Sequence, residues 1–336
     1  MMNIPALPAP HAVNVLTITA NPALDVSAVT PQIRPTSKLR CEQVQRHPGG
    51  GGINVARMLH RLGVECCAVY PEGGTTGALL TTLLADEGVR AQAVAIAGLT
   101  RESFTVQDAS KAQEYRFVLP GPQLSPSEVD ALLQQVQSAL TQSVVGPRWL
   151  VASGSLPPGA PPTFYATLAR MAKQFGARLV VDSSGPALKA AMDEGVYLIK
   201  PSIRELREIS RQALTTIQQV ADVAAVLVKD KKAQVVVVSL GDEGALMVSA
   251  DGCWYAAALQ VPVVSAVGAG DSFVAGMVAA LARSELLLDS FKWGVACASA
   301  SLATAGTGLC DVADVRRLYR SVTLTDGQLD REIAHP

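Results

Sequence analysis

At 336 residues the chain is long enough for one large α/β domain or two small ones, and it can bury a sizeable hydrophobic core. Hydrophobic residues make up 49% and charged residues only 17%, which excludes long solvated tails, and the 4% of aromatic residues predicts an aliphatic core like that of buried parallel strands. The net charge of −1 gives no electrostatic reason to expect a nucleic acid or an acidic membrane surface as partner.

The cysteines and the apolar segments indicate the compartment. Six cysteines occur without a Cys-x-x-Cys pair or a zinc-like histidine spacing, so we expect reduced thiols. The amino-terminal residues lack the basic start and apolar run of a signal peptide. Residues 293–310 carry no charge, but they are mostly Ala, Ser, Thr and Gly, which predicts a close-packed core helix. The sequence therefore predicts a soluble, cytoplasmic protein.

The chain begins with a tail over residues 1–12, and a β-branched run over 13–19 predicts the first strand. Asp25 follows the end of this strand. Ligands of parallel sheets bind beyond the carboxyl ends of the strands, so Asp25 is a candidate for substrate contact, with capping of the turn as the alternative. Residues 26–46 alternate polar and apolar between prolines, which predicts short edge strands.

Four consecutive glycines, residues 49–52, open a helix that we expect to run to about Leu62. Gly50 and Gly51 would let the backbone approach a ligand and would supply free N–H groups. Asn54, one turn into the helix, could hydrogen-bond to hydroxyl groups of that ligand. A flexible hinge is the alternative, although a hinge seldom needs four glycines in a row.

A strand over 65–70 and a helix over 75–87 complete a βα unit, and three alternating segments then follow without a helix between them, at 92–97, 103–108 and 114–119. Together with 26–46 they predict a small antiparallel sheet inserted as a lid, with lid segments at about 26–46 and 92–119. Basic side chains occur on both segments, namely Lys38, Arg40, Arg101 and Arg116. They are either solvated surface residues or clamps for a substrate phosphate.

From residue 125 strands and helices alternate regularly, which predicts a mostly parallel sheet. A capping box, Ser202-x-x-Glu205, opens one of the helices. We expect strands at 149–152, 179–181, 196–199 and 235–241, helices at 126–141, 162–174, 186–193 and 216–229, a hairpin over 244–264, helices at 271–283, 289–303 and 312–320, and a loose tail over 322–336.

The stretch Val267–Phe273 precedes the first of the last three helices. Gly268, Ala269 and Gly270 leave backbone N–H groups bare at a helix start, where the helix dipole favours an anion. Asp271 would be repelled by an anion unless chemistry requires it, and phosphoryl transfer requires a base for the attacking hydroxyl. The alternative is a tight turn with Asp271 as its cap. A third glycine for dinucleotide binding, a Walker loop and a Gly-x-Ser-x-Gly elbow are all absent from this sequence.

The glycine run with Asn54 and the Gly-x-Gly-Asp stretch, at this separation and with a lid between them, resemble the PfkB family of carbohydrate kinases. The resemblance covers about residues 13–320. It implies a single ribokinase-like domain, a three-layer α/β/α fold with a mostly parallel central sheet and an inserted β-sheet lid. It also implies ATP as phosphoryl donor, Mg²⁺, a sugar phosphate as acceptor, and a homodimer formed through the lid.

The family resemblance also implies roles for individual residues. Asp271 would be the base, and Gly268, Ala269 and Gly270 the anion hole. The sugar would be held by Asp25, Gly50, Gly51 and Asn54, its phosphate by Lys38, Arg101 and Arg116, the nucleotide by Lys200, Ser202, Ser239 and Gly241, and the metal by Glu205 through water.

The acceptor implied is fructose 6-phosphate, since segments such as Lys38–Cys41 and Val181–Gly185 resemble the branch of the family that uses it. Glycine at position 51, where the branch that uses fructose 1-phosphate usually carries lysine, favours the same acceptor. Fructose 1-phosphate and tagatose 6-phosphate are the alternatives, and a non-catalytic sugar-phosphate sensor is a rival of another class. Two residues depart from the family pattern: Ser202 replaces the usual Asn of an Asn-x-x-Glu motif, and Arg34 replaces an aromatic lid residue.

Overall fold

A ten-stranded sheet forms the centre of the computed structural model, which describes residues 14–111, 113–142, 148–304, 306, 308–326 and 332–333. In spatial order its strands are β14 (Thr325–Asp326), β13 (Gly252–Ala256), β12 (Ala245–Ser249), β11 (Ala233–Ser239), β10 (Val196–Ile199), β9 (Ala177–Asp182), β8 (Arg148–Ser153), β1 (Val15–Ile18), β4 (Cys66–Glu72) and β5 (Ala91–Ala95). All neighbouring strands from β5 to β11 pair in parallel, whereas β12, β13 and β14 pair antiparallel to their neighbours. The expected mostly parallel sheet is confirmed.

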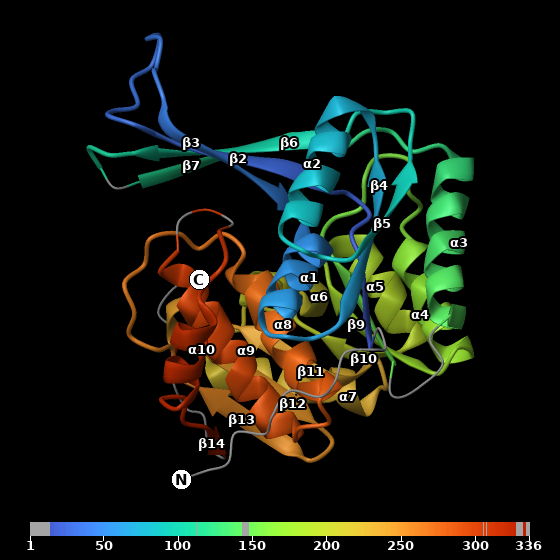
Figure 1. The fold of residues 1–336 in the computed structure, drawn as a ribbon. Coiled ribbons are helices and arrows are strands. Elements are labelled where there is room, and N and C mark those ends of the chain that lie inside the picture. Colours follow the sequence, from blue (N-terminus) through green and yellow to red (C-terminus); the bar gives the residue numbers. More distant parts are fainter. Residues whose placement is uncertain are drawn as a thin grey trace.

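Helices cover both faces of this sheet, which makes three layers (Figure 1). One layer holds α1 (Gly51–Arg61), α2 (Gly74–Asp86), α8 (Ala269–Ala282), α9 (Leu287–Leu302) and α10 (Val312–Tyr319). The other holds α3 (Pro126–Gln142), α4 (Phe164–Gln174), α5 (Gly185–Glu194), α6 (Ile203–Ser210) and α7 (Ile217–Lys229). A 3₁₀ turn, η1 (Gly241–Glu243), follows β11.

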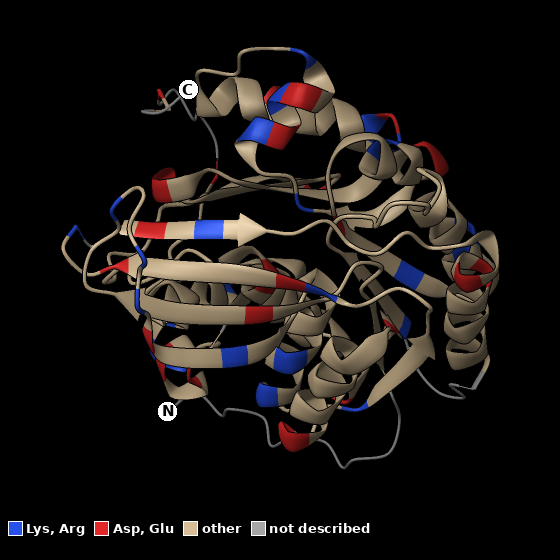
Figure 2. Cartoon of the chain, turned by 90° about the horizontal axis from the view of Figure 1, so that it is seen from above, with Lys and Arg blue, Asp and Glu red and all other residues tan. Residues whose placement is uncertain are grey.

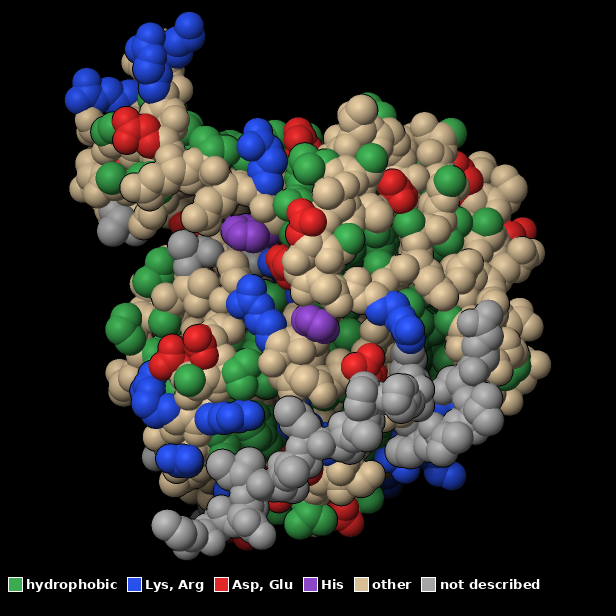
Figure 3. Space-filling model, in the orientation of Figure 1, with side chains coloured by type: hydrophobic (Ala, Val, Ile, Leu, Met, Phe, Trp, Pro, Cys, Tyr) green, Lys and Arg blue, Asp and Glu red, His purple; other side chains and the backbone are tan. Residues whose placement is uncertain are grey.

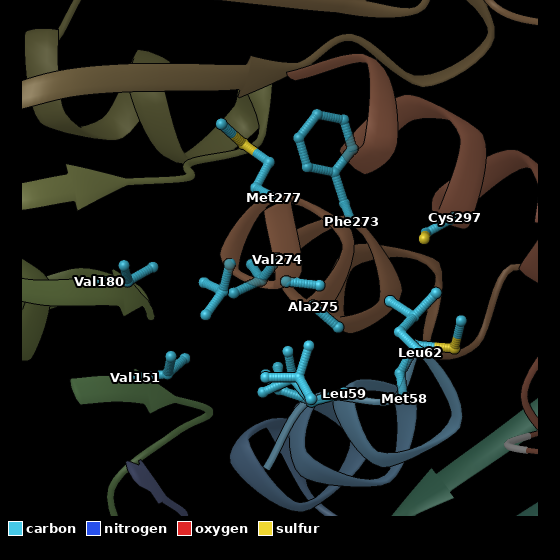
Figure 4. Close-up of a cluster of buried hydrophobic side chains, with 14 of the residues drawn as sticks. Met58, Leu59, Leu62, Val151, Val180, Phe273, Val274, Ala275, Met277 and Cys297 are labelled. Atoms are coloured by element: carbon cyan, nitrogen blue, oxygen red, sulfur yellow. The ribbon is translucent and has the colours of Figure 1, made fainter. Parts of the chain in front are cut away.

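Packing of α1 against α8 determines where the functional side chains lie. Met58 and Leu59 of α1 share a hydrophobic core with Val274 and Met277 of α8 and with Val180 of β9 (Figure 4). These side chains are at most 1% exposed. Because the core is close-packed, the amino ends of the two helices are held beside one another.

A separate four-stranded sheet stands over one side of the molecule and forms the lid (Figures 1 and 2). Its strands, in order, are β3 (Glu42–Gly49), β2 (Ala23–Thr30), β6 (Arg101–Asp108) and β7 (Gln113–Val118). The predicted antiparallel lid is wrong in one pairing, since β2 and β6 run parallel. A long connection through the main domain separates these two strands, so they enter the lid from the same end.

The predicted lid segment over 92–97 is also wrong. Ala91–Ala95 pairs with β4 at the edge of the main sheet, where it is partly exposed and so carries the alternating pattern of a lid strand. The lid instead gains the residues from Ala23 onward. The expected tail over 322–336 is corrected at Thr325–Asp326, which pairs with β13, and the tail over 1–12 lies outside the described residues.

The register of the lid strands gives the sheet two chemically different faces. Asp25 lies level with Ser103 of β6, and Ser27 lies level with Thr105 and, across β6, with Arg116. The opposite face carries the apolar side chains Val26, Phe104, Phe117, Ala28, Val106 and Tyr115 in register, and beside them the charged Arg46, level with Val26, and Glu102, level with Leu24. The polar face is therefore the one that carries the residues predicted to hold a ligand.

None of the described helices is long and apolar enough to cross a membrane.

Candidate active site

The amino end of α8 carries the predicted anion hole. Gly268 is the N-cap with φ of 75°, a left-handed conformation that favours glycine, and Ser272 N donates to its carbonyl over 2.9 Å. A Cβ at Gly270 would lie 3.3 Å from the Lys200 ammonium, so glycine leaves room for that side chain. The first N–H groups of a helix have no partner within it, so this end can accept an anion beside a lysine.

Asp271 lies in the first turn of α8 and faces side chains from three other elements. Its Oδ2 accepts a hydrogen bond of 2.9 Å from Asn54 Nδ2, and its Oδ1 accepts a longer one, 3.4 Å, from Ser153 Oγ. Burial, together with the nearby Asp182 carboxylate, raises the pKa of Asp271 to about 7, although Asn54, Lys200 and Ser153 act in the opposite direction. A carboxylate with this pKa can take a proton near neutral pH.

An ion pair beneath the site joins Lys200 Nζ to Asp182 Oδ1 over 3.2 Å. The two side chains are only 7% and 14% exposed. Burial raises the pKa of Asp182, and Glu205 adds to the effect against the opposing charge of Lys200. The pKa of Lys200 is raised although burial opposes it, because Asp182, Asp271 and Glu205 all favour the ammonium. Lys200, predicted for the nucleotide, thus also lies near Asp271, the predicted base.

Ser153 and Asp182 are site residues that the sequence reasoning missed. Both end neighbouring parallel strands, β8 and β9, where they are in register. The polar exits of these strands were visible in the sequence, and they were the available signal. Their convergence on Asp271 depends on the order of the strands, which no local pattern reveals.

The glycine run is explained by close contacts within the protein. A Cβ at Gly49 would lie 2.1 Å from the Asp25 carboxylate, one at Gly51 would lie 2.2 Å from Ser153 Oγ, and one at Gly52 would lie 2.4 Å from a β1 carbonyl. Gly50 has φ of 108° and caps α1. A hinge is thus the weaker interpretation, because the turn is tightly surrounded. The run brings Asp25 and Asn54, both predicted to hold the sugar, to the same turn.

The three residues predicted to hold the substrate phosphate, Arg101, Arg116 and Lys38, lie in three different environments. Arg101 donates from Nη2 to the Asn21 carbonyl over 3.0 Å and from Nη1 to the Leu119 carbonyl over 3.1 Å, so it ties the lid to the main domain. Its Nε is buried without a hydrogen-bond partner among the described residues, and burial lowers its pKa. Arg116 is exposed on the polar face of the lid. Lys38 is exposed on the β2–β3 connection, which projects away from the main domain (Figure 1).

Ser202 and Glu205 form a reciprocal capping box at the start of α6. Ser202 Oγ accepts from Glu205 N over 3.2 Å, and Ser202 N donates to Glu205 Oε2 over 2.7 Å. The parallel bridge from Ser202 to Ser239 places this cap at the end of β11, and Gly241 follows with φ of 67°. The residues predicted for the nucleotide and metal therefore adjoin the Asp182–Lys200 pair.

Among the described residues, no group of three or more His, Cys, Asp or Glu side chains could hold a metal ion by itself. The charges near Asp271 nevertheless fit a cation that arrives with a ligand. Asp182, Glu205 and Asp271 outnumber the single Lys200, and each of these groups affects the pKa of another. A hollow lies between the lid and the main domain, where such a ligand can enter (Figure 3).

A poised carboxylate at a glycine-rich helix end, a buried lysine and a lid with a polar inner face define a phosphotransferase acting on a hydroxyl group. The chain belongs to the pfkB family of carbohydrate kinases, which matches residues 15–314. Predictions of this family and of an enzyme are confirmed.

Similar proteins agree with this assignment. The ATP-dependent 6-phosphofructokinase isozyme 2 of Mycobacterium tuberculosis is 41% identical over 324 residues, which cover 96% of this chain and 94% of that protein. The crystal structure of phosphofructokinase-2 from Escherichia coli in complex with substrates and products has a TM-score of 0.86 at 39% identity, over 92% of this chain and 99% of that one. A ribokinase from Thermotoga maritima, at 19% identity with a TM-score of 0.72 over 92% of this chain and 100% of its own, bears on the fold alone and confirms the ribokinase-like prediction.

Proposed function

We propose that this protein is an ATP-dependent 6-phosphofructokinase, which transfers the γ-phosphoryl group of ATP to the 1-hydroxyl of fructose 6-phosphate. The observation that carries the proposal is the Asp271 carboxylate, which lies at the amino end of α8 with Asn54 on one side and Lys200 near the other. The similarity to 6-phosphofructokinases supports the choice of donor and acceptor.

In this mechanism Asp271 accepts the proton of the 1-hydroxyl as the oxygen attacks phosphorus. The N–H groups at the start of α8 and the Lys200 ammonium stabilise the negative charge of the transferred group. Asp25 and Asn54 hold the ring hydroxyls, while the nucleotide lies toward Ser202, Ser239 and Gly241. Mg²⁺ bound with the nucleotide, held through water by Glu205, would supply further positive charge.

The phosphate of the acceptor lies toward the polar face of the lid. Arg116 is exposed on that face, and Arg101, at the base of the lid, has a buried Nε without a hydrogen-bond partner among the described residues. Charge-assisted contacts of this kind contribute about 1.5–3 kcal/mol each, which is enough to favour a phosphosugar over a neutral sugar. Asp271 would then meet the free hydroxyl at the other end of the same sugar.

Specificity constants test the assignment. In a coupled assay of ADP release we expect kcat/KM to be higher for fructose 6-phosphate than for fructose 1-phosphate, tagatose 6-phosphate and ribose. A preference for fructose 1-phosphate would contradict the assignment of fructose 6-phosphate as acceptor. If none of these sugars led to release of ADP, the result would favour a non-catalytic sugar-phosphate sensor.

We also propose that the chain forms a homodimer through the lid. The face opposite Asp25 carries apolar side chains of β2, β6 and β7 beside the charged Arg46 and Glu102, and Phe117 on this face is 55% exposed. Exposed apolar sheets need cover, and the same face of a second copy supplies it. Light scattering at micromolar concentration tests this, since a fully active monomer would contradict it.

A further inference from the structure

Arg57 of α1 is 1% exposed, yet it carries a charge and makes an extended set of contacts. Its Nε and Nη2 donate to the two carboxylate oxygens of Glu87, at the end of α2, over 2.7 and 2.6 Å. Its Nη1 donates to the Pro48 carbonyl over 2.9 Å and to Asn54 Oδ1 over 3.3 Å. Arg57 thus links α2, the strand before the glycine run, and a side chain that touches the base.

The contact from Arg57 selects one orientation of the Asn54 amide. An amide has an accepting end and a donating end, and a guanidinium can only donate. Because Oδ1 faces Arg57, Nδ2 faces Asp271 and donates to its Oδ2. The reverse orientation would place Oδ1 against the Asp271 carboxylate and two sets of N–H groups against each other at Arg57.

Stability alone is a poor reason for this arrangement. The cost of dehydrating a buried ion pair often exceeds the gain from its attraction, and apolar residues of similar volume commonly serve as well. The Glu87 side chain remains 27% exposed, so the pair is also not sealed from water. What the Arg57–Glu87 pair does determine is the orientation of the Asn54 side-chain amide.

We propose that Arg57, held by Glu87, is a positioning residue for phosphoryl transfer: it orients the Asn54 amide so that its nitrogen donates to Asp271. This inference rests on the proposed function, because it assigns Asp271 the role of base. It extends the active site to two residues that need not contact either substrate.

The hydrogen bond from Asn54 lowers the pKa of Asp271 against the larger effect of burial. The other groups that act on Asp271 are Asp182, Lys200 and Ser153, and Glu205 acts in turn on Asp182 and Lys200. Arg57 also acts on His47, whose pKa is lowered mainly by burial. Loss of the Asn54 orientation should therefore raise the pKa of Asp271 further, and a base that must be ionised would then need a higher pH.

The experiment compares Arg57→Lys with Arg61→Lys as a matched control. Arg61 lies one turn further along α1 and also donates to backbone carbonyls, those of Leu309 and Cys310, but it lies outside the Asn54 contact. For Arg57→Lys we expect kcat to fall about tenfold with a smaller change in KM, and the acidic limb of the kcat profile to move up by about half to one pH unit. Arg61→Lys should leave the limb in place. An unmoved limb for Arg57→Lys would overturn the proposal.

A double-mutant cycle with Asn54→Ala separates positioning from general support. If Arg57 acts through Asn54, Arg57→Lys should shift the acidic limb of the kcat–pH profile when Asn54 is present but not in the Asn54→Ala background. Equal shifts in both backgrounds would overturn the proposal. Should Arg57→Lys lose its cooperative thermal transition, Glu87→Gln decides: a smaller upward shift supports the inference and none overturns it.

These readouts do not depend on which sugar is phosphorylated, because the acidic limb of the kcat–pH profile can be measured with any sugar that the enzyme uses. A wrong acceptor would therefore leave this inference standing, and an unmoved limb would leave the acceptor standing.

Discussion

Replacing Asp271 by asparagine should abolish most turnover and stabilise the fold at the same time. The base is lost, so kcat should fall by roughly 10²–10⁴ while both substrates still bind. Asparagine has nearly the same shape, and its carbonyl oxygen can still accept from Asn54. The two effects have one cause, because the burial that would suit Asp271 to the proposed role of base also makes its charge costly.

The stability effect has a defined pH window. Burial raises the pKa of Asp271 from the ordinary 3.8 to about 7, so the folded state keeps a proton that the unfolded state releases between these values. The stability that this proton contributes is complete below pH 3.8 and is lost as pH rises to about 7. At about 1.4 kcal/mol per pH unit, Asp271→Asn should gain on the order of 4 kcal/mol over the unchanged protein at pH 8 and less than half of that at pH 5.

Urea unfolding of the protein without substrates, at pH 5 and pH 8, measures this gain, and coupled ADP release measures turnover. Asp193→Asn is the matched control, since Asp193 is an exposed carboxylate paired with Lys232 over 2.8 Å. We expect little change in either measurement for the control. An equal gain at both pH values would refute the buried-base reasoning, and a variant that kept most of its activity would remove Asp271 from the mechanism.

Three further predictions concern the nucleotide cap, the lid surface and the phosphate clamp. Ser202→Asn should keep the α6 cap and lower the Mg²⁺ or ATP concentration needed for half-maximal rate, because the asparagine amide reaches further than the serine hydroxyl. Unchanged Mg²⁺ and ATP requirements would indicate that Ser202 serves only as the helix cap. Phe117→Glu should convert the proposed dimer to a monomer in light scattering, because it places a charge beside the apolar side chains of the lid; an unchanged mass would speak against that interface. Arg116→Ala should raise KM for fructose 6-phosphate about ten- to a hundredfold, with Lys111→Ala of the β6–β7 turn as control; equal KM values for the two variants would refute the clamp.

The main domain could be predicted because its signals are local. Buried parallel strands such as β11 are runs of valine, and the glycine turns at Gly50 and Gly268 need positive φ at specific positions. These same turns placed Asn54 and Asp271 correctly at helix starts, and the structure brings the two side chains together.

What sequence reasoning missed depends on pairing between distant strands. β5 resembles a lid strand because it is an exposed edge, and only its partner β4 assigns it to the main sheet. The Asp182–Lys200 pair likewise exists because β9 and β10 are neighbours. Arg101 was expected to bind phosphate, and its contacts with two backbone carbonyls appear only when the lid is folded onto the main domain.

The parallel pairing of β2 with β6 has a consequence for how the chain folds. Ala23 is in register with Arg101, and β3, α1, β4, α2 and β5 all lie between them in the sequence. During synthesis β2 can form a hairpin with β3 early, but its second neighbour, β6, emerges only after β4 and β5 of the main sheet. Contacts so distant in sequence form slowly unless intervening structure brings them together. We therefore expect the lid to complete its pairing only after these main-sheet strands have been made, and an amino-terminal fragment that ends before residue 101 would lack both β6 and β7.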